Sequence, residues 1–152
     1  DRSVSRGLGD VYKRQVITTP DKKIGVYLHW NGGRDSVEGF LQTCKKYGFR
    51  PPERDNYGWA RLCQVIANFF GPDGLSVGIG PYEELNRNNR DNGVYIIKDW
   101  QIVGREYAPD EEQCEYDIDN FITEVISRQP ERPTPEPKYP AMRAAHTAPA
   151  NN

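Results

Sequence analysis

Apolar and polar residues follow two different periods along this chain, and each change of period marks an expected element. Residues 24–30 are rich in β-branched and aromatic residues and end at a glycine turn, which is typical of a strand. A shorter strand near 16–19 is expected to pair with it. Further strands are predicted at 75–79, 94–98 and 101–107. Only Asp99 and Trp100 separate the last two, which predicts a tight hairpin.

Three other segments carry apolar residues at the spacing of three and four positions that indicates an amphipathic helix. On the first, one face is made by Val37, Phe40, Leu41, Cys44 and Tyr47. Asp35 is expected to cap this helix, with Glu38 completing a capping-box-like arrangement. Gly48 followed by Phe49 predicts a Schellman-type end.

The second predicted helix runs from about Asn56 to Phe70, and its apolar surface is so wide that we expect it at the centre of the core. Its main face is made by Trp59, Leu62, Cys63, Ile66, Phe69 and Phe70. The last predicted helix carries Ile118, Phe121, Ile122, Val125 and Ile126. One turn of helix is also expected at 82–85, before a polar loop at 86–92.

After the short first strand, these elements follow one another in the order β-α-α-β-β-β-α. Strands that cluster in one half of a chain and are joined by short turns pair locally and run antiparallel. The sequence therefore predicts an α+β fold, with a mainly antiparallel sheet of four or five strands and about three helices on one face.

Both ends of the chain differ from the segment between them. Residues 129–152 contain six of the twelve prolines and no Leu, Ile, Val, Phe or Trp, so we expect a disordered, Pro-rich tail there. Such a tail usually serves as a spacer, and the alternative is a ligand for a partner domain. Residues 5–15, SRGLGDVYKRQ, match the translation of a transposon-based sequencing adapter.

The adapter match extends upstream, because the flanking primer and sample index account for residues 1–4. We interpret residues 1–15 as an untrimmed sequencing-adapter translation artefact, which predicts a metagenomic source and a native start that is missing. A single globular domain is then expected at 16–128. Without the adapter, the formal net charge changes from −2 to −4, since the adapter contains four basic and two acidic residues.

The whole chain balances 20 Lys and Arg against 22 Asp and Glu, which argues against a protein that mainly coats nucleic acid or an anionic membrane. No apolar run reaches the roughly 18–20 residues needed to cross a bilayer, and no signal peptide is visible, so we expect a cytoplasmic protein. Cys44, Cys63 and Cys114 are too few for a disulfide scaffold and too far apart for a zinc-binding pair. We therefore expect no metal and no cofactor.

The candidate binding chemistry lies where the strand at 24–30 passes into the first helix. Two glycines let the backbone approach a ligand, the helix start offers free N–H groups, and Arg34 adds a bidentate anion contact. With Trp30 as a stacking surface, the predicted ligand site comprises Trp30, Asn31, Gly32, Gly33, Arg34 and Ser36. The alternative is a plain turn, in which the glycines supply positive φ angles and Asp35 caps the helix.

The segment Asn31–Ser36 resembles the SGGxDS loop of the PP-loop ATP pyrophosphatases, with Asn31 in place of the first serine. The resemblance covers six residues with the flanking strand and helix, and it implies a loop that wraps the pyrophosphate of ATP. In that family, a parallel sheet continues with a second strand soon after the first helix. Here Pro51 and Pro52 follow, and then another helix.

Other chemistries find less support in the residues. Cys63 with His29 is the candidate catalytic pair, but a cysteine on an apolar helix face behaves as a small hydrophobe. Between Glu106 and Val125 there are eight acidic and no basic residues, which suits a basic partner, Ca²⁺ or simple solvation. Basic and aromatic residues around the first two helices indicate weak nucleic-acid binding as an alternative, although acidic residues are interleaved with them.

A wider resemblance rests on the blocks GVYLHWNGGRDSVEGFL, YGWARLCQVIANFFG and DNGVYIIKDWQIVGREY. These blocks look like a group of small uncharacterised proteins of gut anaerobic bacteria and their phages and mobile elements. The resemblance covers nearly all of the expected domain and implies a compact accessory protein. It lends no activity and no site residue.

The leading hypothesis is a small non-catalytic binding or accessory protein of a mobile element or phage. Its expected partner is a nucleotide or another anionic, phosphate-bearing small molecule, or a host protein. One alternative is a small enzyme acting on a nucleotide or other phosphorylated substrate, and another is a weak nucleic-acid-binding domain.

Overall fold

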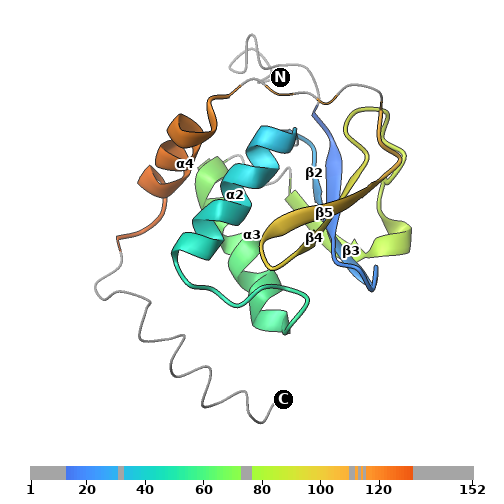
Figure 1. Cartoon of the computed structure of the whole chain (residues 1–152), viewed down its shortest axis with the longest axis horizontal. Coiled ribbons are helices and arrows are strands. Elements are labelled where there is room, and N and C mark those ends of the chain that lie inside the picture. The colour runs from blue at the N-terminus through green and yellow to red at the C-terminus, as the bar shows by residue number, and fades with distance from the viewer. Residues whose placement is uncertain are drawn as a thin grey trace.

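A five-stranded sheet with helices packed on one of its faces forms the body of the protein (Figure 1). The computed structural model describes residues 13–30, 33–72, 77–109, 112, 114 and 116–131. Three α-helices lie within these ranges, which confirms the predicted α+β fold. No helix in the same ranges is long and apolar enough to span a membrane.

The strands are β1 (Gln15–Thr18), β2 (Ile24–Leu28), β3 (Val77–Pro81), β4 (Val94–Lys98) and β5 (Gln101–Glu106). They lie in the order β3-β2-β1-β4-β5. Three neighbouring pairs are antiparallel, as predicted, but β1 and β4 run parallel. The parallel pair arises because the chain leaves β2, passes through two helices and β3, and returns to the free edge of β1. Residues 73–76, which include the first half of the predicted strand at 75–79, lie outside the described residues.

The helices are α2 (Arg34–Lys46), α3 (Asn56–Phe70) and α4 (Ile118–Ser127), and a 3-10 turn, η3 (Tyr82–Glu84), lies between β3 and β4. α2 ends in the predicted Schellman geometry. Gly48 has a φ of 77°, its N–H donates to the Lys45 carbonyl oxygen, and the N–H of Phe49 donates to that of Cys44.

The start of α2 differs from the prediction. Its N-cap is Gly33, and no side chain caps it. Asp35 lies inside the first turn, where its Oδ1 accepts from the N–H of Ser36 and its Oδ2 from the N–H of Tyr116 at 2.7 Å. Glu38 pairs with an arginine one turn back along the helix. The expected capping by Asp35 and Glu38 is therefore wrong, because both carboxylates bind other groups.

The turn between β4 and β5 consists of Asp99 and Trp100, both with positive φ (53° and 62°). This backbone is that of the predicted two-residue hairpin turn. Positive φ is uncommon for a large aromatic residue, but the Trp100 side chain is anchored in the core. It is 5% exposed, and its Nε1 donates to the Phe49 carbonyl oxygen at 2.8 Å. The hairpin is thus tied to the chain just beyond α2.

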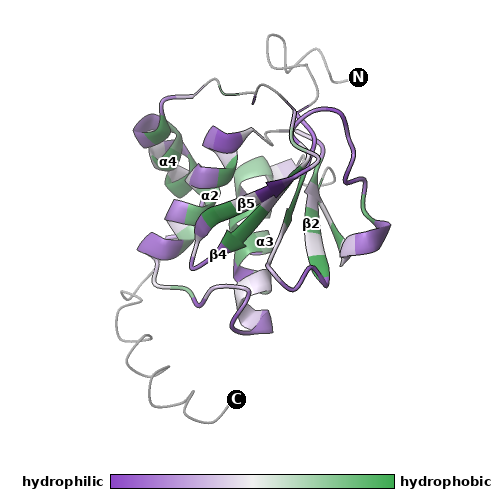
Figure 2. Cartoon of the chain, turned by 45° about the vertical axis from the view of Figure 1, so that its right-hand side comes forward, coloured by the Kyte–Doolittle hydropathy of each residue, from purple (hydrophilic) through white to green (hydrophobic). Residues whose placement is uncertain are grey.

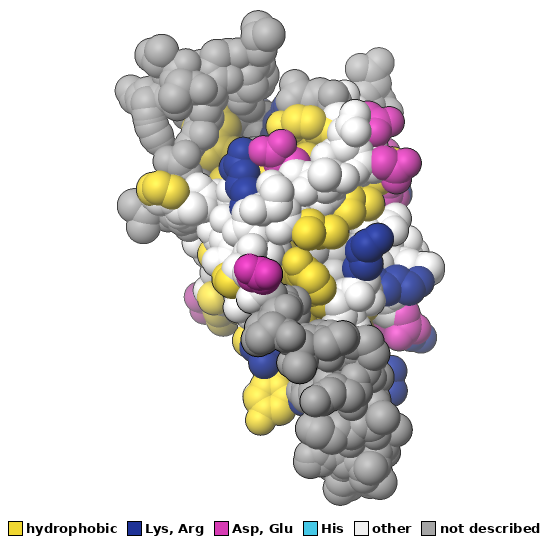
Figure 3. Space-filling view, turned by 90° about the vertical axis from the view of Figure 1, so that its left-hand side faces the viewer, with side chains coloured by type: hydrophobic (Ala, Val, Ile, Leu, Met, Phe, Trp, Pro, Cys, Tyr) yellow, Lys and Arg dark blue, Asp and Glu magenta, His cyan; other side chains and the backbone are white. Residues whose placement is uncertain are grey.

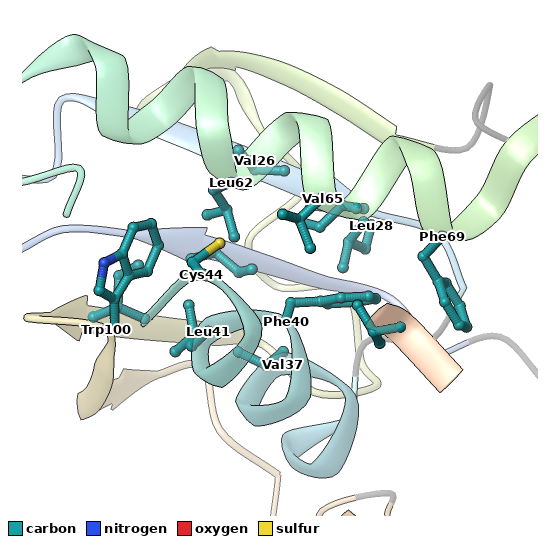
Figure 4. Close-up of a cluster of buried hydrophobic side chains, with 14 of the residues drawn as sticks. Val26, Leu28, Val37, Phe40, Leu41, Cys44, Leu62, Val65, Phe69 and Trp100 are labelled. Carbon is teal, nitrogen blue, oxygen red and sulfur yellow. The ribbon is translucent and has the colours of Figure 1, made fainter. Parts of the chain in front are cut away.

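α2 lies at the centre of the main core, between the sheet, α3 and α4 (Figure 1). Figure 4 shows side chains of α2 packed among those of α3 and β2. The Phe40 ring lies 5.5 Å from Phe69 of α3 and 5.6 Å from Phe121 of α4. α4 approaches closely at Gly39, where a Cβ atom would come within 2.3 Å of the Phe121 ring. In Figure 2, α3 and the strands that face it are hydrophobic, whereas the outer turns are hydrophilic.

A smaller cluster covers the opposite face of the sheet. Val16 of β1 and Val94 of β4 pack there with Tyr82 of η3, and all three are buried. The Tyr82 hydroxyl and the Lys22 ammonium group both donate to Glu106 at the end of β5. The short 3-10 turn thus takes the place of a helix on this face.

The described residues extend beyond both ends of the domain predicted at 16–128. Within the segment that matches the adapter, Gln15 lies in β1, and the side chains of Arg14 and Asp91 form an ion pair at 2.7 Å. Within the Pro-rich segment, the Gln129 side chain donates to the Val65 carbonyl oxygen of α3. Residues 1–12 and 132–152, on which most of the adapter and tail predictions fall, lie outside the described residues.

Replacing Trp59 with alanine should strongly destabilise the fold. Trp59 of α3 is 7% exposed and belongs to the main core, so Trp59→Ala leaves a cavity that lowers the free energy of unfolding by about 3–5 kcal/mol. Urea denaturation measures this change. The matched control is Tyr57→Ala, because Tyr57 lies two residues away and is 56% exposed. Equal losses in the two variants would contradict the assignment of Trp59 to the core.

Replacing Gln15 with leucine should stabilise the fold. The Gln15 side chain is fully buried, and neither its Oε1 nor its Nε2 has a hydrogen-bond partner among the described residues. A buried, unpaired polar group costs about 1–3 kcal/mol, so Gln15→Leu should raise the free energy of unfolding by about that amount. The control is Gln101→Leu at an exposed strand position, with an expected change within about 0.5 kcal/mol. A stability loss in Gln15→Leu would show that the amide is paired in solution.

Candidate functional site

The structure places the predicted ligand-site residues around the end of β2 and the first turn of α2. Asn31 and Gly32 lie outside the described residues. Trp30 is half-buried against the main core, and its ring lies 5.1 Å from that of His29 in a T-shaped contact. The indole therefore contributes to packing, and only part of it remains for a stacking surface.

Gly33 and Ser36 frame the first turn of α2. Gly33 has a φ of −70° and a ψ of 167°, an extended conformation that other residues also adopt. The positive φ that the plain-turn alternative expects is therefore not found at Gly33. Ser36 is 1% exposed, and its Oγ has no hydrogen-bond partner within the described part of the chain. This hydroxyl lies beneath the surface and does not face a ligand in solvent.

Arg34 already contacts anionic groups, and they belong to the protein itself. Its Nε donates to both carboxylate oxygens of Glu112, at 2.9 and 3.0 Å, and its Nη1 donates to Glu38 at 3.3 Å. Its guanidinium carbon lies 5.8 Å from the centroid of the Tyr95 ring. The hydrogen bond to Glu112 raises the pKa of Arg34 above its ordinary value.

A second arginine, Arg105 of β5, reaches the same carboxylate. Its Nη1 donates to Glu112, its Nε donates to the Val94 carbonyl oxygen at 3.1 Å, and its Nη2 donates to the Asn92 carbonyl oxygen. The guanidinium carbon lies 4.0 Å from the centroid of the Tyr95 ring, within the range of a cation–π contact. Arg105 was not among the residues that the sequence predicted for the site.

A β-bulge turns Arg105 toward α2. Successive residues of β4 pair with Ile102 and with Gly104, so Val103 is an extra residue in β5. Side chains alternate between the faces of a regular strand, and alternation from the core residue Ile102 would send Arg105 to the opposite face. The extra residue shifts this phase by one, so Arg105 shares a face with its pairing partner Tyr95.

Glu112 is the shared acceptor of these groups, because the Tyr95 hydroxyl also donates to its Oε2, at 3.2 Å. Burial raises the pKa of Glu112, but the hydrogen bond from Arg34 and the charges of the two arginines outweigh that effect and hold the pKa below its ordinary value. Glu112 is therefore an anion at neutral pH. We call Arg34, Tyr95, Arg105 and Glu112 the arginine cluster.

A hollow of about 300 Å³ lies farther along α2, between that helix and the β4–β5 hairpin. Its lining residues are Glu38, Leu41, Gln42, Trp100, Gln101 and Ile102. One carboxylate, two amides and apolar side chains do not suit an anionic ligand. This hollow is therefore not a candidate site for an anion.

The thiols of Cys44 and Cys63 and the imidazole of His29 are poorly suited to nucleophilic catalysis. Burial raises the pKa of both Cys44 and Cys63, which keeps these thiols protonated at neutral pH. Burial also lowers the pKa of His29, and the Tyr27 hydroxyl lies 3.0 Å from its Nδ1. Within the described ranges, no group of three or more His, Cys, Asp or Glu side chains is arranged to hold a metal ion.

Comparisons of this chain with protein-family models, with curated proteins and with solved structures find no match. The chemistry of the site therefore rests on its own geometry, which is that of two guanidinium groups and one hydroxyl directed at a single carboxylate.

The stability contributed by Glu112 should disappear in acid. The folded-state pKa of Glu112 is lower than the ordinary 4.5, so its contribution is fully present above pH 4.5 and is lost as the pH falls through the lowered value. We expect Glu112→Gln to be less stable than the native chain at neutral pH, with a difference that shrinks as the pH falls below 4.5. Urea denaturation of both proteins, at neutral pH and below pH 4.5, measures this difference in the free energy of unfolding. A difference that does not change with pH would contradict the ionic role of Glu112.

Proposed function

We propose that this chain is a non-catalytic binding domain that recognises an anionic, phosphate-bearing ligand at the arginine cluster and the adjoining start of α2. The observation that carries the proposal is the convergence of Arg34 and Arg105 on one carboxylate. Guanidinium groups present fixed pairs of donors that match carboxylate and phosphate oxygens. An oxyanion is therefore the chemical group for which this arrangement is built.

The position of the cluster beside the start of α2 supports the same ligand class. α2 is 13 residues long and its N-cap residue, Gly33, makes no side-chain cap; within the first turn, Asp35 Oδ1 accepts from the N–H of Ser36. The aligned peptide dipoles of such a helix give its start a partial positive charge. Arg34 is the first residue of the helix, so its guanidinium lies at the end of α2 that carries the partial positive charge.

Two features support binding over catalysis at this site. The lowered pKa of Glu112 keeps the carboxylate ionised at neutral pH, which makes it a poor general acid. The arginines and Tyr95 are donors that hold an anion, and the hydroxyl of Tyr95 has a raised pKa because of its burial. The second candidate is an enzyme that acts on a phosphorylated substrate. The observation that favours it is the resemblance of Asn31–Ser36 to the loop of the PP-loop ATP pyrophosphatases.

The surface around α4 gives little support to nucleic-acid binding. In Figure 3, which views that side, basic and acidic side chains are interspersed with hydrophobic ones. Nucleic acid is bound by continuous basic surfaces that follow the phosphate backbone. We therefore prefer a small anionic ligand. The proposal also includes an accessory role in a phage or mobile element, which is supported by the sequence resemblance to proteins of that kind.

Arg34→Ala should weaken binding of the phosphate-bearing ligand. Loss of a charged hydrogen bond costs about 1.5–3 kcal/mol, which corresponds to a dissociation constant about 10 to 150 times larger. A thermal-shift panel of nucleotides, dinucleotides and pyrophosphate at low salt identifies the ligand, and titration calorimetry measures its affinity. The control is Arg54→Ala, because Arg54 is exposed and its replacement removes the same charge.

The outcomes of this experiment separate the candidate functions. Weaker binding in Arg34→Ala but not in Arg54→Ala, with the ligand recovered intact by chromatography, supports a binding domain. Conversion of the ligand favours the enzyme. The anion site must be abandoned if no phosphorylated compound raises the melting temperature, or if the two variants bind equally well.

A further inference from the structure

The carboxylate of Glu112 is the shared acceptor of three donors in the arginine cluster. It accepts from Arg34 Nε, from Arg105 Nη1 and from the Tyr95 hydroxyl, the last at 3.2 Å. These donors come from α2, β5 and β4, three elements of the packed core. Their shared acceptor, Glu112, comes from the connection between β5 and α4.

Each of the three donors is also held by contacts that do not involve Glu112. Arg105 is held by the Val94 and Asn92 carbonyl oxygens and by the Tyr95 ring. Arg34 retains its contact with Glu38 one turn along the helix, and Tyr95 is fully buried in the core. We therefore expect the donors to keep their positions when Glu112 leaves.

Departure of Glu112 does not require α4 to leave the core. Beyond Glu112, the chain is fixed again at Tyr116, whose N–H donates to Asp35 Oδ2 at 2.7 Å and whose ring stacks on Phe121 at 4.7 Å. Phe121 is in turn buried against α2. The connection is thus anchored independently on the α4 side, and the contacts that have to break among the described residues are those of the Glu112 carboxylate.

We propose that Glu112 is an intramolecular competitor at the arginine cluster, and that a phosphate-bearing ligand binds by replacing its carboxylate. This inference rests on the proposed anion-binding function. Release of Glu112 frees one donor from each of Arg34, Tyr95 and Arg105 for the ligand. A phosphate group offers more acceptor oxygens and more negative charge to these donors than a carboxylate does, which is why the ligand can replace Glu112.

Such competition has a defined effect on affinity. The apparent dissociation constant is the intrinsic one divided by the fraction of molecules with an open site. If Glu112 occupies the site about nine-tenths of the time, its removal tightens binding about tenfold. The ligand is then bound only at concentrations that overcome the internal carboxylate, so Glu112 sets the threshold of the response.

The test compares two glutamate variants that remove the same charge. Glu112→Gln removes the competitor, whereas Glu106→Gln removes a carboxylate that accepts from Tyr82 and Lys22 on the opposite face. Pyrophosphate is the probe, and titration calorimetry at low salt is the measurement. We expect Glu112→Gln to bind pyrophosphate about ten times more tightly than the native chain, and Glu106→Gln to bind like the native chain.

The outcomes distinguish this inference from the proposed function. If the native chain, Glu112→Gln and Glu106→Gln all bind pyrophosphate with equal affinity, Glu112 is not a competitor, but the anion site stands. If none of the three binds pyrophosphate or inorganic phosphate, both the anion site and the competitor are overturned. Should Glu112→Gln fail to fold, a glutamate-specific protease tests the native chain. Faster cleavage after Glu112 when pyrophosphate is present supports the inference, and an unchanged rate overturns it.

Discussion

The placement of α2 is the constraint on which the rest of this structure depends. The helix packs against the sheet, against α3 and against α4, so most of its circumference is buried. Gly39 is what makes the third contact close, because any side chain there would overlap the Phe121 ring. With α2 held on these sides, the side chain of its first residue, Arg34, lies near Tyr95 and contacts Glu112.

The β-bulge at Val103 then determines which residue of β5 lies beside Arg34. It places Arg105 on the side of α2 and Glu106 on the side of η3, so two adjacent residues of one strand serve two different faces. The polar clusters on the two faces of the sheet are similar in kind, since each combines the hydroxyl of a buried tyrosine with a glutamate and basic groups. They differ in charge: Glu106 meets one hydrogen-bonded cation, Lys22, whereas Glu112 meets two arginines.

Local patterns in the sequence were enough to predict the elements, but not the contacts between distant segments. Apolar spacing predicted α3 to its exact ends, and the pair Asp99–Trp100 predicted the hairpin, because both depend on neighbouring residues. The parallel pairing of β1 with β4 joins strands more than 70 residues apart, and no local pattern encodes it. The capping role predicted for Asp35 is wrong for the same reason, because its Oδ2 accepts from the N–H of Tyr116, which is distant in sequence.

The sequence predicts Arg34 as an anion-binding residue, and in the structure its guanidinium contacts the carboxylates of Glu112 and Glu38. Two guanidinium groups held close together in a half-buried site repel each other and lose hydration, so leaving them without an anion is costly. The same penalty explains why a carboxylate lies between the two arginines in this structure. In the binding mode that we propose, one anion replaces another, because a neutral molecule in place of Glu112 would deprive Arg105 of its carboxylate and leave Arg34 with Glu38 alone. The selectivity that we propose therefore depends on charge rather than on apolar contact.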